Sequence, residues 1–291
     1  MLDKATTPGA ERVIRPTASD IDPHAHAVRQ RRLYFLLAWL APVVIILLWA
    51  AGVHSGIIDA RFFPSPETVA SEAVDLTTSG ELWTHVWATT RRVALGFPIG
   101  AVAGIMFGLF LGRFAWARAA FQPTVTAAYT IPKLGLYPLL LLIFGIDDMP
   151  KVVLVAVSTF LLVCISAAGA VANIPQNLLD VGRAFHASRR MQFFEIILPS
   201  ALPEIFTSLR IAIGMAILVV IGTEFVNARD GVGFLIWNSW TLFQPEPMYV
   251  GMVVSGIMGV IATGAVGLLE GVAMPWRSKK RGKRNKPAQP S

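Results

Sequence analysis

Long apolar runs separated by short polar segments dominate the amino-acid sequence. The first run, residues 33–51, is almost wholly apolar. Because an α-helix rises about 1.5 Å per residue, about 20 such residues cross a hydrocarbon core about 30 Å thick. Further apolar runs follow at residues 93–111, 125–146, 152–171, 201–226 and 249–272, and the run at 125–146 is interrupted by Lys133 and Pro138. The pattern therefore predicts an all-α polytopic membrane protein with about six transmembrane helices.

The segment before the first run, residues 1–32, is polar and mixed, with no sustained period. It predicts an irregular N-terminal tail. A secretory signal peptide is the alternative interpretation of this end of the chain. The polar segment is too long for one, and the apolar run exceeds the usual signal-peptide core of about 7–15 residues. We therefore expect an uncleaved first span.

The composition supports the membrane class. Of the 291 residues, 54% are hydrophobic and 15% are charged, whereas a soluble domain is about a quarter charged. The formal net charge is +7. Lysine and arginine gather in both tails and in the loops after the second and fourth runs, which predicts cytoplasmic termini rather than a nucleic-acid partner. We expect a membrane domain at 33–275 and a basic cytoplasmic tail at 276–291.

Two short segments are expected on the outer face of the membrane. One helix should begin at Pro66 and end at Gly80, because Val69, Ala73 and Leu76 share one helical face. A second interfacial or re-entrant piece, rich in Phe and Trp, follows the turn at residues 230–231. Both pieces are explained equally well as plain anchors at the headgroup level.

A strict four-residue glycine ladder lies in the second run, at Gly96, Gly100, Gly104, Gly108 and Gly112. Residues four apart lie on one helix face, so this face is smooth. It predicts close packing against another helix. A sliding surface between moving helices is the functional alternative.

The loop between the fourth and fifth runs is amphipathic. Pro175 can open a helix on which Leu178, Val181 and Phe185 share one face. A break is expected next, followed by a second short helix capped by Ser188. Such a bent pair of helices either lies on lipid or inserts into a groove of a soluble partner.

Charged residues inside or beside the spans are candidates for a transport pathway. Lys133 is either a pathway cation for an anionic solute or a snorkelling or internally paired lysine. Arg210 and Glu224 are 14 residues apart, about 21 Å along a helix, and cannot pair with each other. We favour pairing of each with a neighbouring helix. Arg91 and Arg92 either draw anions to the outer mouth or anchor the second span.

The amphipathic loop resembles the EAA loop of ABC importer permeases, in the form seen in the nitrate/sulfonate/taurine branch. Asp180, Val181 and Gly182 match its acid-small-small positions loosely, and Ile197-Leu198-Pro199 matches its ending. The resemblance covers about residues 62–272 and includes, in order, Phe63-Pro64-Ser65-Pro66, the glycine ladder, Ile131-Pro132-Lys133, Phe144-Gly145-Ile146, Leu209-Arg210-Ile211-Ala212 and Gly231-Val232-Gly233.

The resemblance implies a type I ABC importer permease fold in the bacterial inner membrane. It further implies two ATPase copies holding ATP and Mg, a second permease copy as a homodimer, and an extracytoplasmic binding protein for a small anion such as a sulfonate, taurine, nitrate or an organic carboxylate. This chain lacks a GxxxxGK[ST] phosphate loop, so it is expected to be non-catalytic and to bind no cofactor itself. The implied coupling loop, 173–199, contacts the ATPase through Asp180, Val181, Gly182, Arg183, Ala184, Phe185, His186, Ala187, Ser188, Leu198 and Pro199. A membrane scaffold or receptor, or an ion-coupled carrier, remains the alternative.

Two positions depart from the family pattern, Val181 and His186. Glycine is usual at the bend because it tolerates positive φ, and histidine is among the few other residues found there. The bend is therefore either kept at His186, at a cost of about 1 kcal/mol, or recast. The five histidines form no motif for a metal, and Cys164 is expected to be a buried packing residue.

Overall fold

The computed structural model describes residues 23–276. Contacts within the chain divide it into two units after Pro66. The first unit contains α2 (Pro23–His54), of which Leu33–His54 is long and apolar enough to cross a membrane. The helix begins at Pro23, so the prediction of an irregular tail is wrong for residues 23–32. The remainder of that tail, 1–22, and the basic tail at 277–291 lie outside the described residues.

The elements of the second unit are also helices in its described part. Its elements are α3 (Pro66–Thr78), α4 (Glu81–Arg113), α5 (Ala115–Thr130), the 3-10 turn η1 (Lys133–Leu136), α6 (Tyr137–Phe144), α7 (Met149–Ala172), α8 (Gln176–Ala184), α9 (Arg189–Met191), the π-helical turn η2 (Gln192–Ile197), α10 (Leu198–Val226), α11 (Val232–Thr241) and α12 (Pro245–Ala273). Among the described residues, five helices are long and apolar enough to span a membrane, or six with one bent pair. This agrees with the predicted fold class.

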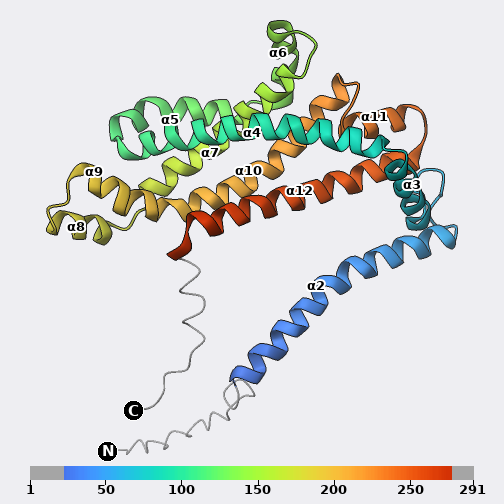
Figure 1. Cartoon of the computed structure of the whole chain (residues 1–291), viewed down its shortest axis with the longest axis horizontal. Coiled ribbons are helices and arrows are strands. Elements are labelled where there is room, and N and C mark those ends of the chain that lie inside the picture. Colours follow the sequence, from blue (N-terminus) through green and yellow to red (C-terminus); the bar gives the residue numbers. More distant parts are fainter. Residues whose placement is uncertain (1–22, 277–291) are drawn as a thin grey trace, which may run out of the picture. The chain divides into compact units, whose positions relative to one another are not determined.

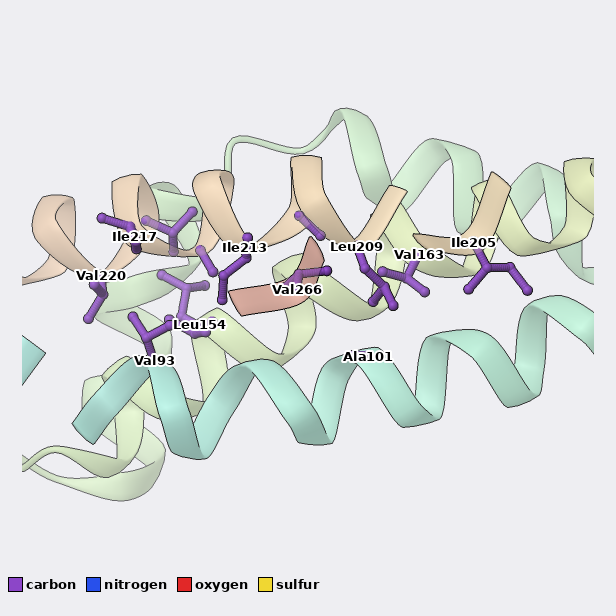
Figure 2. Packing of buried hydrophobic residues seen from close by; sticks show 14 of the residues in the cluster. Val93, Ala101, Leu154, Val163, Ile205, Leu209, Ile213, Ile217, Val220 and Val266 are labelled. Carbon is purple, nitrogen blue, oxygen red and sulfur yellow. The ribbon is translucent and has the colours of Figure 1, made fainter. Parts of the chain in front are cut away.

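The core of this unit lies between α4, α7 and α10. Figure 2 shows Leu154 and Val163 of α7 beside Ile205, Ile213 and Val220 of α10, with α4 running along them. These side chains are buried because the helices bring their apolar faces together. The four central helices, α4, α7, α10 and α12, run alongside one another in Figure 1.

The glycine ladder brings α4 into close contact with α7. A Cβ atom placed on Gly104 would lie 2.9 Å from the carbonyl oxygen of Phe160, and one on Gly108 would lie 2.5 Å from that of Cys164. Both distances are too short for a carbon–oxygen contact, which needs about 3.3 Å. The packing prediction is therefore confirmed, as is the burial of Cys164.

The third predicted span is not a single straight helix. The helices on either side, α5 and η1–α6, meet at an angle of 90°, which agrees with the interruption predicted at Lys133 within the run over residues 125–146. Ile131 has an extended backbone, with φ −63° and ψ 132°, because the ring of Pro132 disfavours a helical conformation in the residue before it. A new helical segment then begins at Lys133.

The two ends of the helical unit carry different short elements. The turn from α8 to α9 lies at one end, and α11 lies at the other (Figure 1). The predicted second short helix of the 173–199 loop is not separate, because α9, η2 and α10 form one helix from Arg189 to Val226. The short helices predicted near residues 66–80 and after residue 231 are both present, and Val69 and Leu76, which were predicted to share one face of α3, are both buried.

Candidate functional site

The α8 end of the unit presents an apolar face to its surroundings. Leu178, Val181 and Phe185 are all exposed, and Phe185 is 82% exposed at the tip of the loop. Asp180 and Arg183 form an exposed ion pair at 3.0 Å on the same helix. A solvated loop of this size does not need an exposed phenylalanine at its tip, so the face is a candidate docking surface.

The bend after α8 is a Schellman motif with histidine at its left-handed position. His186 has φ 51°. Its backbone N–H donates to the carbonyl of Arg183 (3.0 Å), and that of Ala187 donates to the carbonyl of Gly182 (2.9 Å). These two bonds define the motif, in which glycine is the usual residue at the position of His186. Of the two alternatives for the bend, the structure has the one in which His186 keeps a positive φ.

The second half of the loop is fixed by a side-chain cap and by one small residue. The hydroxyl of Ser188 accepts a bond from the backbone N–H of Met191 (3.2 Å), which is the predicted N-cap. A Cβ atom on Gly182 would lie 2.6 Å from the Cδ1 atom of Ile196. Gly182 therefore lets α8 pack directly on η2, so the bend and the long helix that follows it form one assembly. Ala184 is exposed, and Leu198 and Pro199 begin α10 half-buried.

Lys133 lies directly after the 90° break of the third span. Its ammonium group donates to the backbone carbonyl of Tyr129 (2.7 Å) and lies 4.0 Å from the centre of the Tyr129 ring. This is the internally bonded arrangement given as the alternative to a pathway cation. An ammonium group has three donors, and the half-buried side chain stays partly accessible.

The two charges of α10 pair with different neighbours, as favoured from the sequence. Arg210 forms an ion pair with Glu270 of α12. Glu224, 1% exposed, forms an ion pair with Arg92 of α4 at 2.7 Å, and Arg92 itself is 2% exposed. A buried charge needs such a partner, because an isolated one is costly to remove from water.

Arg92 also holds two acidic residues that sequence reasoning missed. Its guanidinium donates to the carboxylate of Asp148 (2.8 Å), to the backbone carbonyl of Asp230 (2.9 Å), and to the Asp230 carboxylate. Arg91 pairs with Asp148 as well. We call Arg91, Arg92, Asp148, Lys151, Glu224 and Asp230 the ionic cluster; Lys151 lies 3.5 Å from Asp148.

Asp148 lies just before α7, outside the apolar helices. Partial burial acts to raise the pKa of its carboxyl group. Hydrogen bonds from Arg92 and the charges of Arg92 and Lys151 outweigh burial, so the pKa is held below its ordinary value. Asp148 is therefore ionised at neutral pH and completes the charge balance around the two arginines.

At the α11 end of the unit, side chains from other helices bind the first turn of α11. The backbone N–H groups of Gly231, Val232 and Gly233 donate to His85 Nδ1 (3.1 Å), Thr89 Oγ1 (2.8 Å) and Glu224 Oε2 (2.8 Å), respectively. Gly231 is the N-cap residue of α11 and has no side chain of its own to supply. We call His85, Thr89 and Glu224 the α11 cap.

Sequence reasoning did not identify the α11 cap, although a signal for it was present. His85, Thr89 and Arg92 recur at i, i+4 and i+7, which is one face of α4. The turn Gly231-Val232-Gly233 precedes an aromatic helix. Neither pattern identifies its partner, because the contacts of this α4 face join residues more than 130 positions apart. Among the described residues, no group of His, Cys, Asp or Glu could hold a metal ion.

The sequence pattern of one protein family matches residues 100–271, which is more than half of the chain. The family is described as the binding-protein-dependent transport system inner membrane component. The chain is 32% identical over 238 residues to the putative aliphatic sulfonates transport permease protein SsuC of Escherichia coli, covering 82% of this chain and 90% of that protein. It is 30% identical to SsuC of Bacillus subtilis, covering 89% and 95%.

Other relatives extend the comparison. The nitrate import permease protein NrtB of Leptolyngbya laminosa is 29% identical, covering 70% of this chain and 72% of that protein. Among solved structures, a chain of the inward-facing MetNI methionine ABC transporter matches with a TM-score of 0.57 and 21% identity, covering 65% of this chain and 96% of that one. The match shows that the helical unit has the type I ABC importer permease fold.

Proposed function

Because the chain belongs to the binding-protein-dependent transport system inner membrane component family, we propose that it is the membrane-spanning subunit of an ATP-driven importer. It is a multi-pass permease without a catalytic role of its own. In this proposal a separate ATPase subunit docks on the exposed face of α8 and drives alternating access. Two ATPase copies, a second copy of this chain and an extracytoplasmic binding protein complete the complex.

One observation carries the proposal, which is the accessible apolar face that ends in Phe185. The Schellman motif at His186 holds Phe185 away from the rest of the helical unit, and the helix from Arg189 to Val226 leads directly from this surface into the core. A surface connected to a long helix in this way can pass on a displacement. A face that only rested on lipid would not need that connection.

The charge distribution supports the orientation of the complex in the membrane. Lys and Arg are concentrated in the tails and in the loops that contain Arg113 and Arg183. Under the positive-inside rule, this distribution supports a cytoplasmic position for α8, where an ATPase is found, and an outer position for α11 and the ionic cluster.

The transported solute is proposed to be a small anion. Relatives named for aliphatic sulfonates and for nitrate both concern anions. Lys133 lies at the break of the third span, where the backbone is irregular and a membrane protein tolerates this only beside protein or water. An ammonium group there would contact an anion during passage. The carrier alternative is weakened because Glu224, its strongest candidate acid, is occupied by Arg92, Thr89 and Gly233.

The docking proposal is tested by isolating the complex from membranes and measuring ATP hydrolysis. Phe185→Ala should dissociate the ATPase or reduce its activity by about tenfold or more, since a buried aromatic anchor contributes about 2 kcal/mol or more to an interface. Phe243→Ala is the matched control, because Phe243 is equally exposed at the opposite end. Equal ATPase recovery and activity in both variants would contradict the proposal.

The pathway role of Lys133 is tested separately by uptake of taurine, ethanesulfonate and nitrate into proteoliposomes. Lys133→Ala should slow uptake without preventing assembly, and Lys133→Arg should restore most of it, because only the arginine keeps a positive charge at the break. Uptake by Lys133→Ala at the rate of the unmodified protein would exclude this role.

A further inference from the structure

The first turn of α11 depends on groups that its own sequence does not supply. A helix normally satisfies its first N–H groups with the side chain of the N-cap residue. Here that residue is Gly231, and three consecutive N–H groups are bound instead by His85, Thr89 and Glu224. The start of α11 is therefore attached to α4 and α10 rather than to itself.

Close packing also attaches the start of α11 to α10. A Cβ atom on Gly233 would lie 2.5 Å from the carbonyl oxygen of Ile221 and 2.7 Å from the Cβ atom of Glu224. Gly231 has φ 115° and lies against the Glu224 carboxylate. The turn before α11 thus wraps closely around the last helical turns of α10, and the two segments cannot slide past each other without breaking these contacts.

Glu224 lies near the end of the helix that starts beside the docking surface. That helix runs from Arg189 to Val226, and its first turn follows the Ser188 cap. We propose that Thr89 and Glu224 are positioning residues that make α11 follow α10 and α4, so that a displacement of the 173–199 loop reaches the extracytoplasmic end through α11. This inference rests on the proposed function.

Thr89 is the residue through which the inference is best tested. Its hydroxyl donates to Glu224 (2.9 Å to Oε1) and accepts from the N–H of Val232 (2.8 Å). It is fully buried. Thr89→Val keeps the shape of the side chain but removes both bonds, whereas Thr89→Ser keeps the hydroxyl. Neither change touches the docking surface.

The experiment uses the whole complex, isolated with its ATPase and reconstituted with its binding protein. Thr89→Val should leave the basal ATPase rate unchanged and lower the stimulation by loaded binding protein about tenfold, as the loss of a hydrogen bond to a charged group predicts. Thr89→Ser should retain the stimulation. Thr207→Val is the matched control, since that hydroxyl lies on an exposed face of α10 and bonds only to the carbonyl of Pro203 among the contacts described.

A second measurement reports on α11 directly. Trp240 is exposed on α11, whereas the single native cysteine, Cys164, is buried. In Trp240→Cys, the rate of maleimide labelling should differ between the nucleotide-free and the ATP-vanadate states. The added change Thr89→Val should abolish this difference while leaving ATP binding intact. Altered stability alone would not remove a nucleotide-dependent difference.

The outcomes separate this inference from the proposed function. Full stimulation and a normal labelling difference in Thr89→Val would overturn it, as would equal defects in Thr89→Val and Thr89→Ser. If Thr89→Val does not assemble, Glu224→Gln replaces it in the same comparison, and normal stimulation in that variant overturns the inference. A complex without ATP-dependent uptake in the unmodified protein would refute the proposed function instead.

Discussion

Gly108→Ala is the substitution whose effect follows most directly from the structure. The added Cβ atom would lie 2.5 Å from the carbonyl oxygen of Cys164 and 2.7 Å from the Cβ atom of Ala167. Ordinary contacts need about 3.3 Å to oxygen and about 3.5 Å or more between carbons. Neither neighbour can rotate away, because one is backbone and the other is the only side-chain atom of alanine.

The helices α4 and α7 must therefore separate by nearly 1 Å around this position. Overpacking of this kind costs about 1–3 kcal/mol. Gly256→Ala is the matched control, since nothing lies within 4 Å of a Cβ atom added at Gly256 on α12. The free energy of unfolding, measured in detergent micelles with increasing SDS, should fall for Gly108→Ala and stay nearly constant for Gly256→Ala.

A result in which both alanine variants unfold at the same SDS content would refute the argument from close packing. The transport assay adds a second comparison. If the ladder served only for sliding between helices, Gly108→Ala would leave stability unchanged and reduce uptake alone. The structure predicts that Gly108→Ala lowers stability, because α4 and α7 are already in contact at Gly108 in the described conformation.

Two further predictions concern backbone strain and pH. His186→Val should impair ATPase coupling, because a β-branched residue at φ 51° is a steric outlier, whereas His186→Gly should retain coupling; equal ATPase stimulation in the two variants would contradict the Schellman assignment. The folded-state pKa of Asp148 is lowered from 3.8, so its ionised form contributes stability above that value, and the contribution is lost as the pH falls through the lowered pKa. Unfolding measured from about pH 5 down to below the lowered pKa should therefore show a weaker acid destabilisation in Asp148→Asn than in the unmodified protein. Parallel pH profiles would show that the salt bridges of Asp148 do not stabilise the fold.

The sequence was sufficient to predict the spans that are straight helices. The runs that became α4, α7, α10 and α12 are uninterrupted and long, so length and hydropathy decide them. Lys133 and Pro138 indicated an interruption of the third span, but its angle of 90° was not predicted, because the residues on both sides are apolar and hydropathy does not register backbone direction. The signal for the bend is local, because Pro132 restricts the backbone of the residue before it.

The residues of the candidate sites also differ in how far the sequence predicts them. The position of His186 followed from its place in a loop pattern, since a C-terminal helix motif is local and involves few neighbouring residues. The partners of Arg92 could not be predicted from the sequence, because Asp148 and Asp230 lie in distant turns that only the folded chain brings next to it. Intramembrane charges can therefore be identified from sequence, whereas the residues that neutralise them require the tertiary structure.

The helix from Arg189 to Val226 has 38 residues, which corresponds to about 57 Å and exceeds the hydrocarbon core of about 30 Å almost twofold. The helix is therefore long enough to extend beyond the bilayer or to cross it obliquely. Rotation by about 10° around its midpoint would swing each end by about 5 Å, in opposite directions. A modest tilt at the Arg189 end would thus produce an opposite displacement of similar size beside Glu224.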